Sequence, residues 1–413
     1  MKKLIIFLTV ILITALSFSA PIKLEKSGSD NTSVFKTISG NTSDKTDENN
    51  GPEKIINSVN CFTGIVVRDL ETENIIYEYN KDKMFIPASL NKLLVTYAAL
   101  KQFGASKTFE TKIYFDNIPQ PLYNGNIYIK GFGDPYLSKD EYENFIKSVM
   151  KKYNIEEISG NIYFDYSYYS NNNIFGKGWM WDDSQPQIEA LDLYSDSPEV
   201  FRTKTYSAAR DINEFITVDT ISSMNIRFRG EIYYAKVPED IKYTETHYSA
   251  KLSEILKKML KVSDNYIAEM LYRDIGAETG EYYTQKQAER IITEITDKSG
   301  INGFIIKDGA GLSMYNLISP ENINRLILEL NKIVYLRSYL ATPSEESTIK
   351  ERFDYPVWAK TGSLNNSSGI AGILYTKKGT QLVFTVMENN YSVGYYDIKE
   401  YENKIIDYFY NNY

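Results

Sequence analysis

The chain has 413 residues, of which 43% are hydrophobic and 24% are charged, and its formal net charge is −8. This length and composition are typical of a globular protein with room for two domains. The negative charge and the lack of a long basic run argue against nucleic acid as a partner. The single cysteine, Cys61, excludes an intramolecular disulfide, and the single histidine, His247, excludes a histidine-rich metal site.

Residues 1–20 are predicted to form an export signal. Lys2 and Lys3 precede an apolar stretch from Leu4 to Phe18. Small residues, Ser17, Ser19 and Ala20, lie at its end. An apolar run of about 15 residues is short for a membrane span. An uncleaved anchor stays open, since Pro21 directly follows Ala20. We therefore expect an exported protein of the periplasm or cell envelope, which meets a membrane only through this segment if it is retained.

Residues 21–55 are predicted to be a disordered linker. They are rich in Ser, Thr, Asn, Asp, Lys and Gly, and such a segment cannot bury enough apolar surface to fold. Ordered structure is expected from about residue 56. Strands are predicted over residues 63–69 and 74–79, and a helix over residues 89–103, where apolar side chains recur at helical spacing and Gly104 ends the pattern.

The pattern changes over residues 108–240. Short alternating strands are separated there by Gly, Pro and Asn, and one helix is predicted over residues 139–153. We interpret this part as an inserted, mostly β domain. Beyond it, helices are predicted over residues 249–261, 265–275, 284–298, 320–333 and 398–410, and strands over residues 370–377 and 381–387. Residues 56–107 and 241–413 together fit one α/β (α+β) domain that the insertion splits.

The sequence Ser-x-x-Lys occurs four times in the chain, but only Ser89 opens an apolar helix after a strand region. Ser89 and Lys92 then lie on one helical face, one turn apart. The helix N-terminus favours negative charge on the serine oxygen, and a buried lysine loses its proton more readily. Lys92 is thus a candidate general base. The alternative is a helix-capping serine next to a surface lysine.

A second polar motif, Ser263-Asp264-Asn265, lies between two predicted helices. A loop there can present a hydroxyl and an amide to a cleft. The alternative is an ordinary helix N-cap.

The third motif, Lys360-Thr361-Gly362, occurs once, a few residues before the predicted strand at Ile370. Gly362 allows a ligand to approach the backbone closely, and Lys360, Thr361 and Ser363 can bind a carboxylate. The alternative is a turn at a strand end. The three motifs in this order supply a nucleophile, two candidate bases, an amide and a cation, which indicates acyl transfer through a covalent serine ester.

With these motifs the chain resembles the penicillin-recognising serine acyl-enzymes. Within them it resembles the D-alanyl-D-alanine carboxypeptidase/endopeptidase family of low-molecular-mass penicillin-binding proteins that carry a large insert between the first two motifs. The resemblance runs from about residue 60 to the C-terminus and includes the segments 87–89, 131–135, 178–183, 263–265, 308–313 and 360–363. It implies a penicillin-binding/serine β-lactamase-like transpeptidase domain with an inserted domain.

The resemblance also implies roles for single residues. Ser89 attacks the carbonyl between two D-alanines, and Lys92 accepts its proton. Ser263 relays a proton towards the leaving amine, with Lys360 close by. The substrate is bound by Asn265, Thr361, Gly362 and Ser363, and the backbone N–H groups of Ser89 and Ser363 form the oxyanion hole. Asp182 is a candidate for holding the amino group of the peptidoglycan diamino acid, or else a structural turn residue.

The chain departs from the family pattern at several positions. Ser363 stands where the family often has Thr, Ala310 where it usually has Ser, and Met314 where it often has a basic residue. The family commonly has an aromatic residue after segment 178–183, which contains Trp and Asp; here that aromatic residue is replaced near Gln187.

The resulting hypothesis is a serine DD-carboxypeptidase that removes the terminal D-alanine from peptidoglycan pentapeptide stems. Cleavage of cross-links is left open. Neither a metal nor an organic cofactor is expected, and β-lactams are expected to acylate Ser89. Two alternatives remain, a serine β-lactamase and a non-catalytic wall-binding or β-lactam-binding module. A Ser-His-Asp triad would need His247, for which we prefer a plain polar position, and Cys61 is expected to pack at a strand edge.

Overall fold

The computed structural model describes residues 51–169, 178–180, 188–194, 206–277 and 285–413 of the chain. Within these ranges no helix combines the length and the apolar character that crossing a membrane requires. The predicted export segment lies outside them, as does the predicted linker up to residue 50. A short helix, α1 (Glu53–Ile56), begins inside the stretch that was predicted to be linker.

A five-stranded antiparallel sheet joins the two ends of the described chain. Its strand order is β11-β12-β13-β1-β2, so that an N-terminal hairpin pairs with three C-terminal strands. The bounds are β1 (Phe62–Asp69), β2 (Ile75–Tyr79), β11 (Val357–Leu364), β12 (Ser367–Tyr375) and β13 (Gln381–Asn389). Successive residues of the central strands β12 and β13 are buried, so both faces of these strands are covered. This burial explains their nearly continuous apolar sequence.

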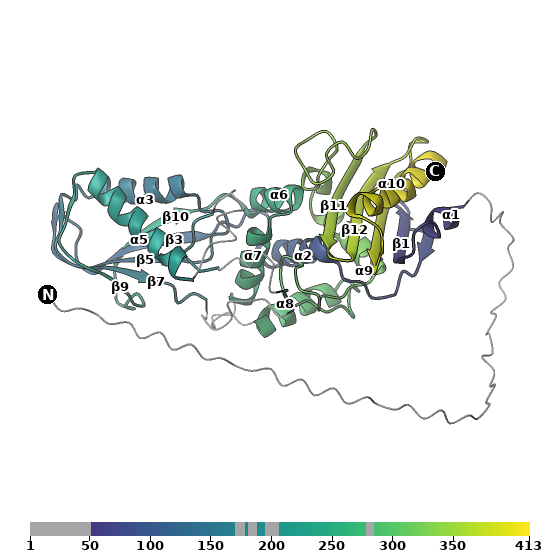
Figure 1. Cartoon of the computed structure of the whole chain (residues 1–413). Coiled ribbons are helices and arrows are strands. Elements are labelled where there is room, and N and C mark those ends of the chain that lie inside the picture. Colours follow the sequence, from purple (N-terminus) through teal and green to yellow (C-terminus); the bar gives the residue numbers. More distant parts are fainter. Residues whose placement is uncertain (1–50, 170–177, 181–187, 195–205, 278–284) are drawn as a thin grey trace, which may run out of the picture. The chain divides into compact units, whose positions relative to one another are not determined.

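Helices cover both faces of this sheet (Figure 1). The C-terminal helix α10 (Tyr395–Asn412) packs with α1 on one face, over side chains such as Ile370 and Val386. On the other face lie α2 (Asn91–Phe103) and α9 (Pro320–Ile333). Ser319 caps α9, because its side chain accepts the Asn322 N–H, and Pro320 occupies the first helical turn.

Three further helices enclose α2. They are α6 (Leu252–Val262), α7 (Asn265–Ala277) and α8 (Gln285–Asp297), and each contacts α2. Every residue of α2 from Asn91 to Leu100 is buried. A helix that is buried all round holds its side chains in fixed rotamers. The structure therefore places the first candidate motif on a rigid element.

Residues between α2 and α6 form sheets of their own. One has the order β10-β3-β5-β7-β9 and the other the order β4-β6-β8. The strands are β3 (Glu110–Phe115), β4 (Leu122–Tyr123), β5 (Ile127–Gly131), β6 (Glu157–Ile158), β7 (Ile162–Asp165), β8 (Arg227–Phe228), β9 (Ile232–Tyr234) and β10 (Tyr243–Tyr248).

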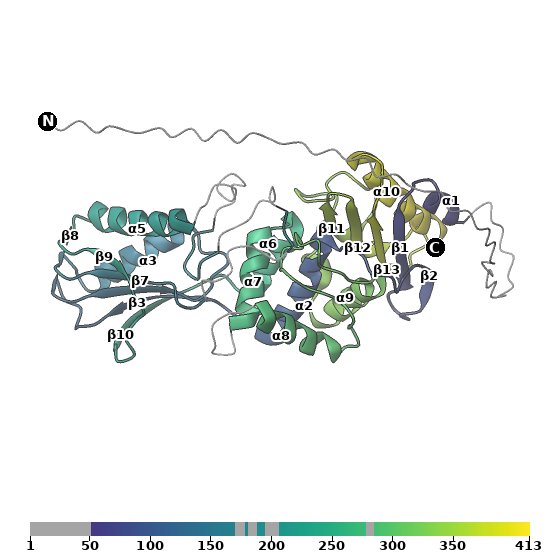
Figure 2. The same cartoon turned by 60° about the horizontal axis from the view of Figure 1, so that its bottom comes forward.

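Two helices pack on this part of the chain among the residues that the structure describes, where the sequence predicted only one. The predicted helix is α3 (Lys139–Lys152), and the second is α5 (Tyr206–Ser223), which lies beside it (Figure 2). The expectation of a single helix among strands was wrong because α5 is rich in β-branched residues, which lower helix propensity. Packing stabilises the helix instead, and the Tyr142 hydroxyl is 2.8 Å from the Thr217 hydroxyl.

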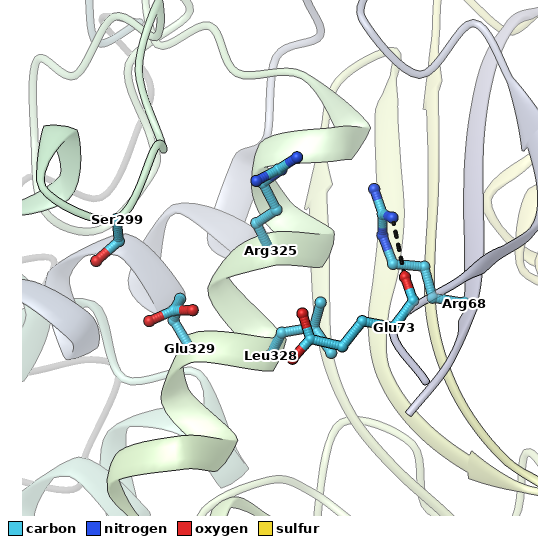
Figure 3. Close-up of a pocket in the computed structure, with 6 residues that line it drawn as sticks. All are labelled: Arg68, Glu73, Ser299, Arg325, Leu328 and Glu329. Atoms are coloured by element: carbon cyan, nitrogen blue, oxygen red, sulfur yellow. Dashed lines mark hydrogen bonds between the residues drawn. The ribbon is translucent and has the colours of Figure 1, made fainter. Parts of the chain in front are cut away.

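A cavity of about 170 Å³ beside α9 is lined mainly by charged side chains (Figure 3). Arg68 of β1 is nearly buried and forms an ion pair with Glu321. Its Nε also donates to Asn324 Oδ1 at 3.1 Å, and its Nη1 donates to the Glu73 carbonyl oxygen at 3.4 Å. Arg325 reaches the same Glu321 carboxylate from the surface, at 2.7 Å. The cluster ties the hairpin β1–β2 to α9.

We expect Arg68→Met to lower the free energy of unfolding by about 3 kcal/mol, because it removes the buried partner of Glu321. The matched variant Arg325→Met should cost about 1 kcal/mol or less, since that arginine side chain is 48% exposed. Urea unfolding of both variants measures the difference. Equal losses would mean that burial does not decide the strength of these two ion pairs.

Candidate active site

Ser89 lies on a tight turn that leads directly into α2. The turn is a 3-10 helix (Ala88–Leu90), and Asn91 is the first residue of α2, so the regular helix starts slightly later than predicted. Ala88 has a left-handed backbone with φ of 49°, which is unusual for a residue with a side chain. Ser89 is partly exposed although its neighbours Ala88 and Leu90 are buried. The turn thus presents the hydroxyl to solvent on a buried support.

The amine of Lys92 is fully buried and meets three oxygen atoms. Nζ donates to Ser89 Oγ at 3.0 Å, to Asn265 Oδ1 at 2.8 Å and to the Ala310 carbonyl oxygen at 2.6 Å. Residues from the first two sequence motifs are therefore joined at one nitrogen. The alternative of a surface lysine is wrong, since the exposed fraction of Lys92 is 0%.

Burial lowers the pKa of Lys92 to about 8, although the negative charges of Asp308, Asp264 and Glu269 act in the opposite direction. A neutral amine is consequently accessible near neutral pH. At 3.0 Å from Ser89 Oγ it is placed to accept the proton of that hydroxyl.

A second lysine and serine pair lies in the same site. Lys360 is also fully buried, and its Nζ donates to Ser263 Oγ at 2.8 Å and to the Thr361 carbonyl oxygen at 2.5 Å. Its pKa is well below the usual range because of burial first, and then because of the positive charges of Lys92 and Lys399. Ser263 itself has a left-handed backbone, with φ of 62°, at the end of α6. That strained conformation aims its hydroxyl at Lys360 instead of continuing the helix.

The second motif contains the helix cap that was its alternative interpretation, and its other two residues contact the two lysines. The Asp264 carboxylate accepts the Ile267 N–H at 3.0 Å and so caps α7. Its other oxygen accepts the Tyr194 hydroxyl at 2.9 Å. The cap leaves Ser263 and Asn265 free to face the two lysines. The junction between α6 and α7 therefore combines a structural turn with a polar site.

The third motif lies within β11, where the sequence placed it just ahead of a strand near Ile370. This strand was missed because the motif contains lysine and glycine, two residue types that are depleted in strands. A Cβ atom on Gly362 would lie 2.6 Å from the Pro87 carbonyl oxygen and 3.1 Å from the Ser89 nitrogen. Only glycine lets the strand edge approach the serine turn this closely. Ser363 is exposed, and its hydroxyl donates to the Gly362 carbonyl oxygen at 2.8 Å.

The loop 308–313 supports Lys92 through the Ala310 carbonyl oxygen. The sequence analysis did not assign a role to this loop. Asp308 accepts the backbone N–H groups of Gly311, Leu312 and Ser313 at 2.8–3.0 Å. Glu269 accepts the N–H groups of Gly309 and Ala310 at 2.7 Å each. These contacts fix the Ala310 carbonyl that receives the amine.

Asn91 and Trp179 complete this support. Asn91 Nδ2 donates to the Asp308 carbonyl oxygen at 2.7 Å, and Trp179 Nε1 donates to the Asp308 carboxylate at 2.6 Å. Burial, and then the charge of Asp308, raises the pKa of Glu269 to about 8. A signal was present in the sequence, since Glu269 lies four residues after Asn265 on the same face of α7.

A hollow of about 310 Å³ adjoins Ser363. Its described lining is mostly apolar and comprises Met180, Leu312, Met314, Ser363, Leu364, Asn365 and Tyr395. Met314, which stands where the resemblance suggested a basic residue, is part of this lining. Asp182 lies outside the described residues, so its predicted role stays a prediction.

The remaining candidates lie apart from these contacts. The ring of His247, in β10, packs on Phe145 of α3, while the Ser89 hydroxyl is bonded to Lys92. Cys61 Sγ lies 3.1 Å from the Thr63 hydroxyl, and burial raises its pKa. No cluster of three or more His, Cys, Asp or Glu residues suited to a metal ion occurs among the residues with described positions.

The combination of fold and site defines a penicillin-binding, β-lactamase-like class of protein, and comparison with known proteins gives the family. Residues 57–210 and 205–411 match the D-Ala-D-Ala carboxypeptidase 3 (S13) family. The chain belongs to this family and is a serine-type peptidase. The resemblance inferred from the three motifs is thereby confirmed.

Individual relatives are distant in sequence. D-alanyl-D-alanine carboxypeptidase DacB of Haemophilus influenzae is 23% identical over 80% of this chain and 86% of its own length. The D-alanyl-D-alanine carboxypeptidase of an Actinomadura species is 22% identical over 80% and 78%. The crystal structure of penicillin-binding protein 4 from Haemophilus influenzae has a TM-score of 0.76 at 20% identity, covering 87% of this chain and 99% of that one.

A predatory peptidoglycan endopeptidase of Bdellovibrio bacteriovorus has a TM-score of 0.56 at 21% identity, covering 83% of this chain and 90% of that one. These likenesses confirm the predicted fold class.

We expect Gly311→Ala to lower peptidase activity about 100-fold, the loss that a displacement of roughly 1 Å near the chemistry produces. Gly311 has φ of 86°, and an added Cβ would lie 2.0 Å from the Ala88 carbonyl oxygen, next to Ser89. Gly303→Ala is the matched control, since Gly303 has φ of 72° but no atom within 4 Å of an added Cβ. Hydrolysis of a D-Ala-D-Ala peptide is measured for both. An equal loss of activity in the two variants would show that backbone strain, and not the contact with Ala88, matters.

Proposed function

We propose that this protein is a serine DD-carboxypeptidase that removes the terminal D-alanine from peptidoglycan pentapeptide stems through an acyl-enzyme on Ser89. One observation carries the proposal: a fully buried amine, that of Lys92, lies 3.0 Å from the hydroxyl of a partly exposed serine. Membership of a D-Ala-D-Ala carboxypeptidase family supports the substrate class. The predicted export segment supports action in the periplasm or cell envelope, where these stems occur.

The first step forms the acyl-enzyme. Neutral Lys92 accepts the Ser89 proton, and Oγ attacks the carbonyl carbon between the two D-alanines. The N–H groups of Ser89 and Ser363 stabilise the negative oxygen of the tetrahedral intermediate. The C–N bond then breaks, Ser263 relays a proton to the departing nitrogen, and Lys92 becomes neutral again. D-Alanine leaves, and the shortened stem remains as an ester on Ser89.

The second step hydrolyses the ester. Water loses a proton to Lys92 and adds to the ester carbonyl, and Ser89 recovers its proton as it leaves. Lys360 holds the Ser263 hydroxyl at 2.8 Å through both steps. Asn265, which accepts from Lys92, presents its amide N–H₂ to the peptide, and the proposed approach of the substrate backbone to β11 is at Gly362. The hydroxyls of Thr361 and Ser363 bind the terminal carboxylate, and Asp182 is the proposed contact for the diamino acid.

Endopeptidase cleavage of cross-links is the second candidate. A cross-link carries a D-alanine carbonyl bound to another stem, so the same acylation chemistry applies. The similar fold of a Bdellovibrio peptidoglycan endopeptidase favours including it. β-Lactams are proposed to acylate Ser89 as substrate mimics, and a related endopeptidase structure is described as acylated by penicillin G. A serine β-lactamase hydrolyses its penicilloyl ester rapidly, so slow hydrolysis of this ester would distinguish a carboxypeptidase from a β-lactamase.

Ser89→Ala tests the nucleophile. The protein from residue 21 onward should release D-alanine from a purified pentapeptide muropeptide, and the variant should lose this activity by at least about 1,000-fold, as for other catalytic serines. The variant should also fail to form a covalent adduct with a fluorescent penicillin. Unchanged release by the variant would refute the serine mechanism, and release from cross-linked dimers alone would favour the endopeptidase.

The acylation rate should depend on the ionisation of Lys92. Only the neutral amine accepts a proton, so below its pKa of about 8 the rate should fall about tenfold per pH unit. Above that pH the rate should level off, since the lysine is already neutral. Stopped-time labelling with a fluorescent penicillin from about pH 6 to about pH 9 measures this dependence. A rate that rises as the pH falls would exclude Lys92 as the base.

A further inference from the structure

A third buried lysine lies behind the strand that carries the third motif. Lys399, on α10, is 8% exposed. Its Nζ donates to Ser368 Oγ at 2.7 Å, to Glu402 Oε1 at 3.0 Å and to the carbonyl oxygen of Gly362 at 3.4 Å. The last contact joins α10 to the middle of the motif in β11. None of the sequence motifs includes this lysine.

Lys399 is held in place by a buried ionic cluster. Glu402 is completely buried and is shared with Arg352, whose Nη2 donates to its second carboxylate oxygen at 2.7 Å. Burial alone would raise the pKa of Glu402, but the positive charges of Lys399 and Arg352 lower it. Breaking a buried ionic cluster is costly. The lysine amine is thus fixed against the back of β11 instead of moving freely.

The contact with Gly362 has a consequence for the next residue. The carbonyl of Gly362 and the N–H of Ser363 belong to the same peptide unit, which is planar and trans, so they point in opposite directions. Holding the carbonyl from behind therefore sets the direction of the N–H. A donor on the carbonyl oxygen also polarises the peptide and strengthens the N–H as a donor.

Among the described residues, only one side chain besides Lys399 donates to the Gly362 carbonyl oxygen, and that side chain has a second task in the proposed reaction. The Ser363 hydroxyl donates to the Gly362 oxygen at 2.8 Å. In the proposed reaction the same hydroxyl turns to the substrate carboxylate. Lys399 then remains as the side chain that holds the peptide unit while the oxyanion forms.

We propose that Lys399 is a positioning residue, which acts from the far face of the sheet to aim the Ser363 N–H at the oxyanion. The proposal rests on the proposed serine mechanism. It concerns the transition state more than substrate binding, because the oxyanion exists only after Oγ has attacked. Its loss should lower kcat with little change in KM.

The test compares Lys399→Met with Lys399→Arg and with Arg352→Met. The last variant removes the other cation of the same cluster but leaves the Gly362 contact, so it is the matched structural control. For Lys399→Met we expect kcat for a D-Ala-D-Ala peptide to fall about tenfold or more, part of the loss seen when an oxyanion donor is removed. The affinity for a D-alanine boronic acid, whose tetrahedral adduct resembles the intermediate, should fall in the same proportion. Lys399→Arg should restore most of both.

Arg352→Met should lower the stability to urea comparably while kcat changes less than about twofold, within ordinary variation for a distant site. Equal losses of kcat in Lys399→Met and Arg352→Met would overturn the proposal, as would a loss confined to KM. If Lys399→Met does not fold, Lys399→Gln provides the same comparison with a shorter polar side chain. Full activity of Ser89→Ala would instead refute the serine mechanism itself, so the two failures are distinguishable.

Discussion

The site depends on the burial of two amines within one cleft. Lys92 and Lys360 both have no exposed surface, and each lies on a serine hydroxyl, at 3.0 Å and 2.8 Å. Removing an ammonium ion from water costs several kcal/mol, and the fold meets this cost in two ways. It supplies oxygen acceptors such as the Ala310 carbonyl, and it lowers the pKa of both amines. The same desolvation that destabilises the charged lysines produces the neutral base that acyl transfer requires, so stability and reactivity are linked at these two residues.

Keeping water from these amines requires three distant chain segments to meet closely. The serine turn, the loop 308–313 and strand β11 approach so tightly that a methyl group at Gly311 or Gly362 would collide with the backbone of residues 87–89. The antiparallel sheet makes this possible, since it pairs β1 near the N-terminus with β13 near the C-terminus. The predicted insertion over residues 108–240 is compatible with this arrangement, because the segments that meet are set by sheet pairing and by the packing of α2.

The sequence was informative where chemistry requires a residue type at a short spacing. Ser89 with Lys92, Ser263 with Asn265, and Lys360 with Gly362 were identified from local motifs, and the structure brings them together. It was uninformative where a role arises from long-range contact. Glu269 supports the site through a loop about 40 residues away, and Lys399 reaches β11 from the last helix. Helix α5 was missed for a similar reason, since packing outweighs its β-branched composition. Asp182 stays a prediction.

The central sheet separates two tasks on its two faces. On one face α2 and α7 hold the nucleophile and its proton acceptor, and on the other face α10 holds the peptide unit between Gly362 and Ser363. The peptide unit is planar, so fixing the direction of its carbonyl on one face of the strand also fixes the direction of its N–H. A buried ionic cluster is weak evidence for net stability, and here it holds the Lys399 amine against the carbonyl of Gly362. Its location behind the third motif is therefore better explained by the geometry of the site than by the stability of the fold.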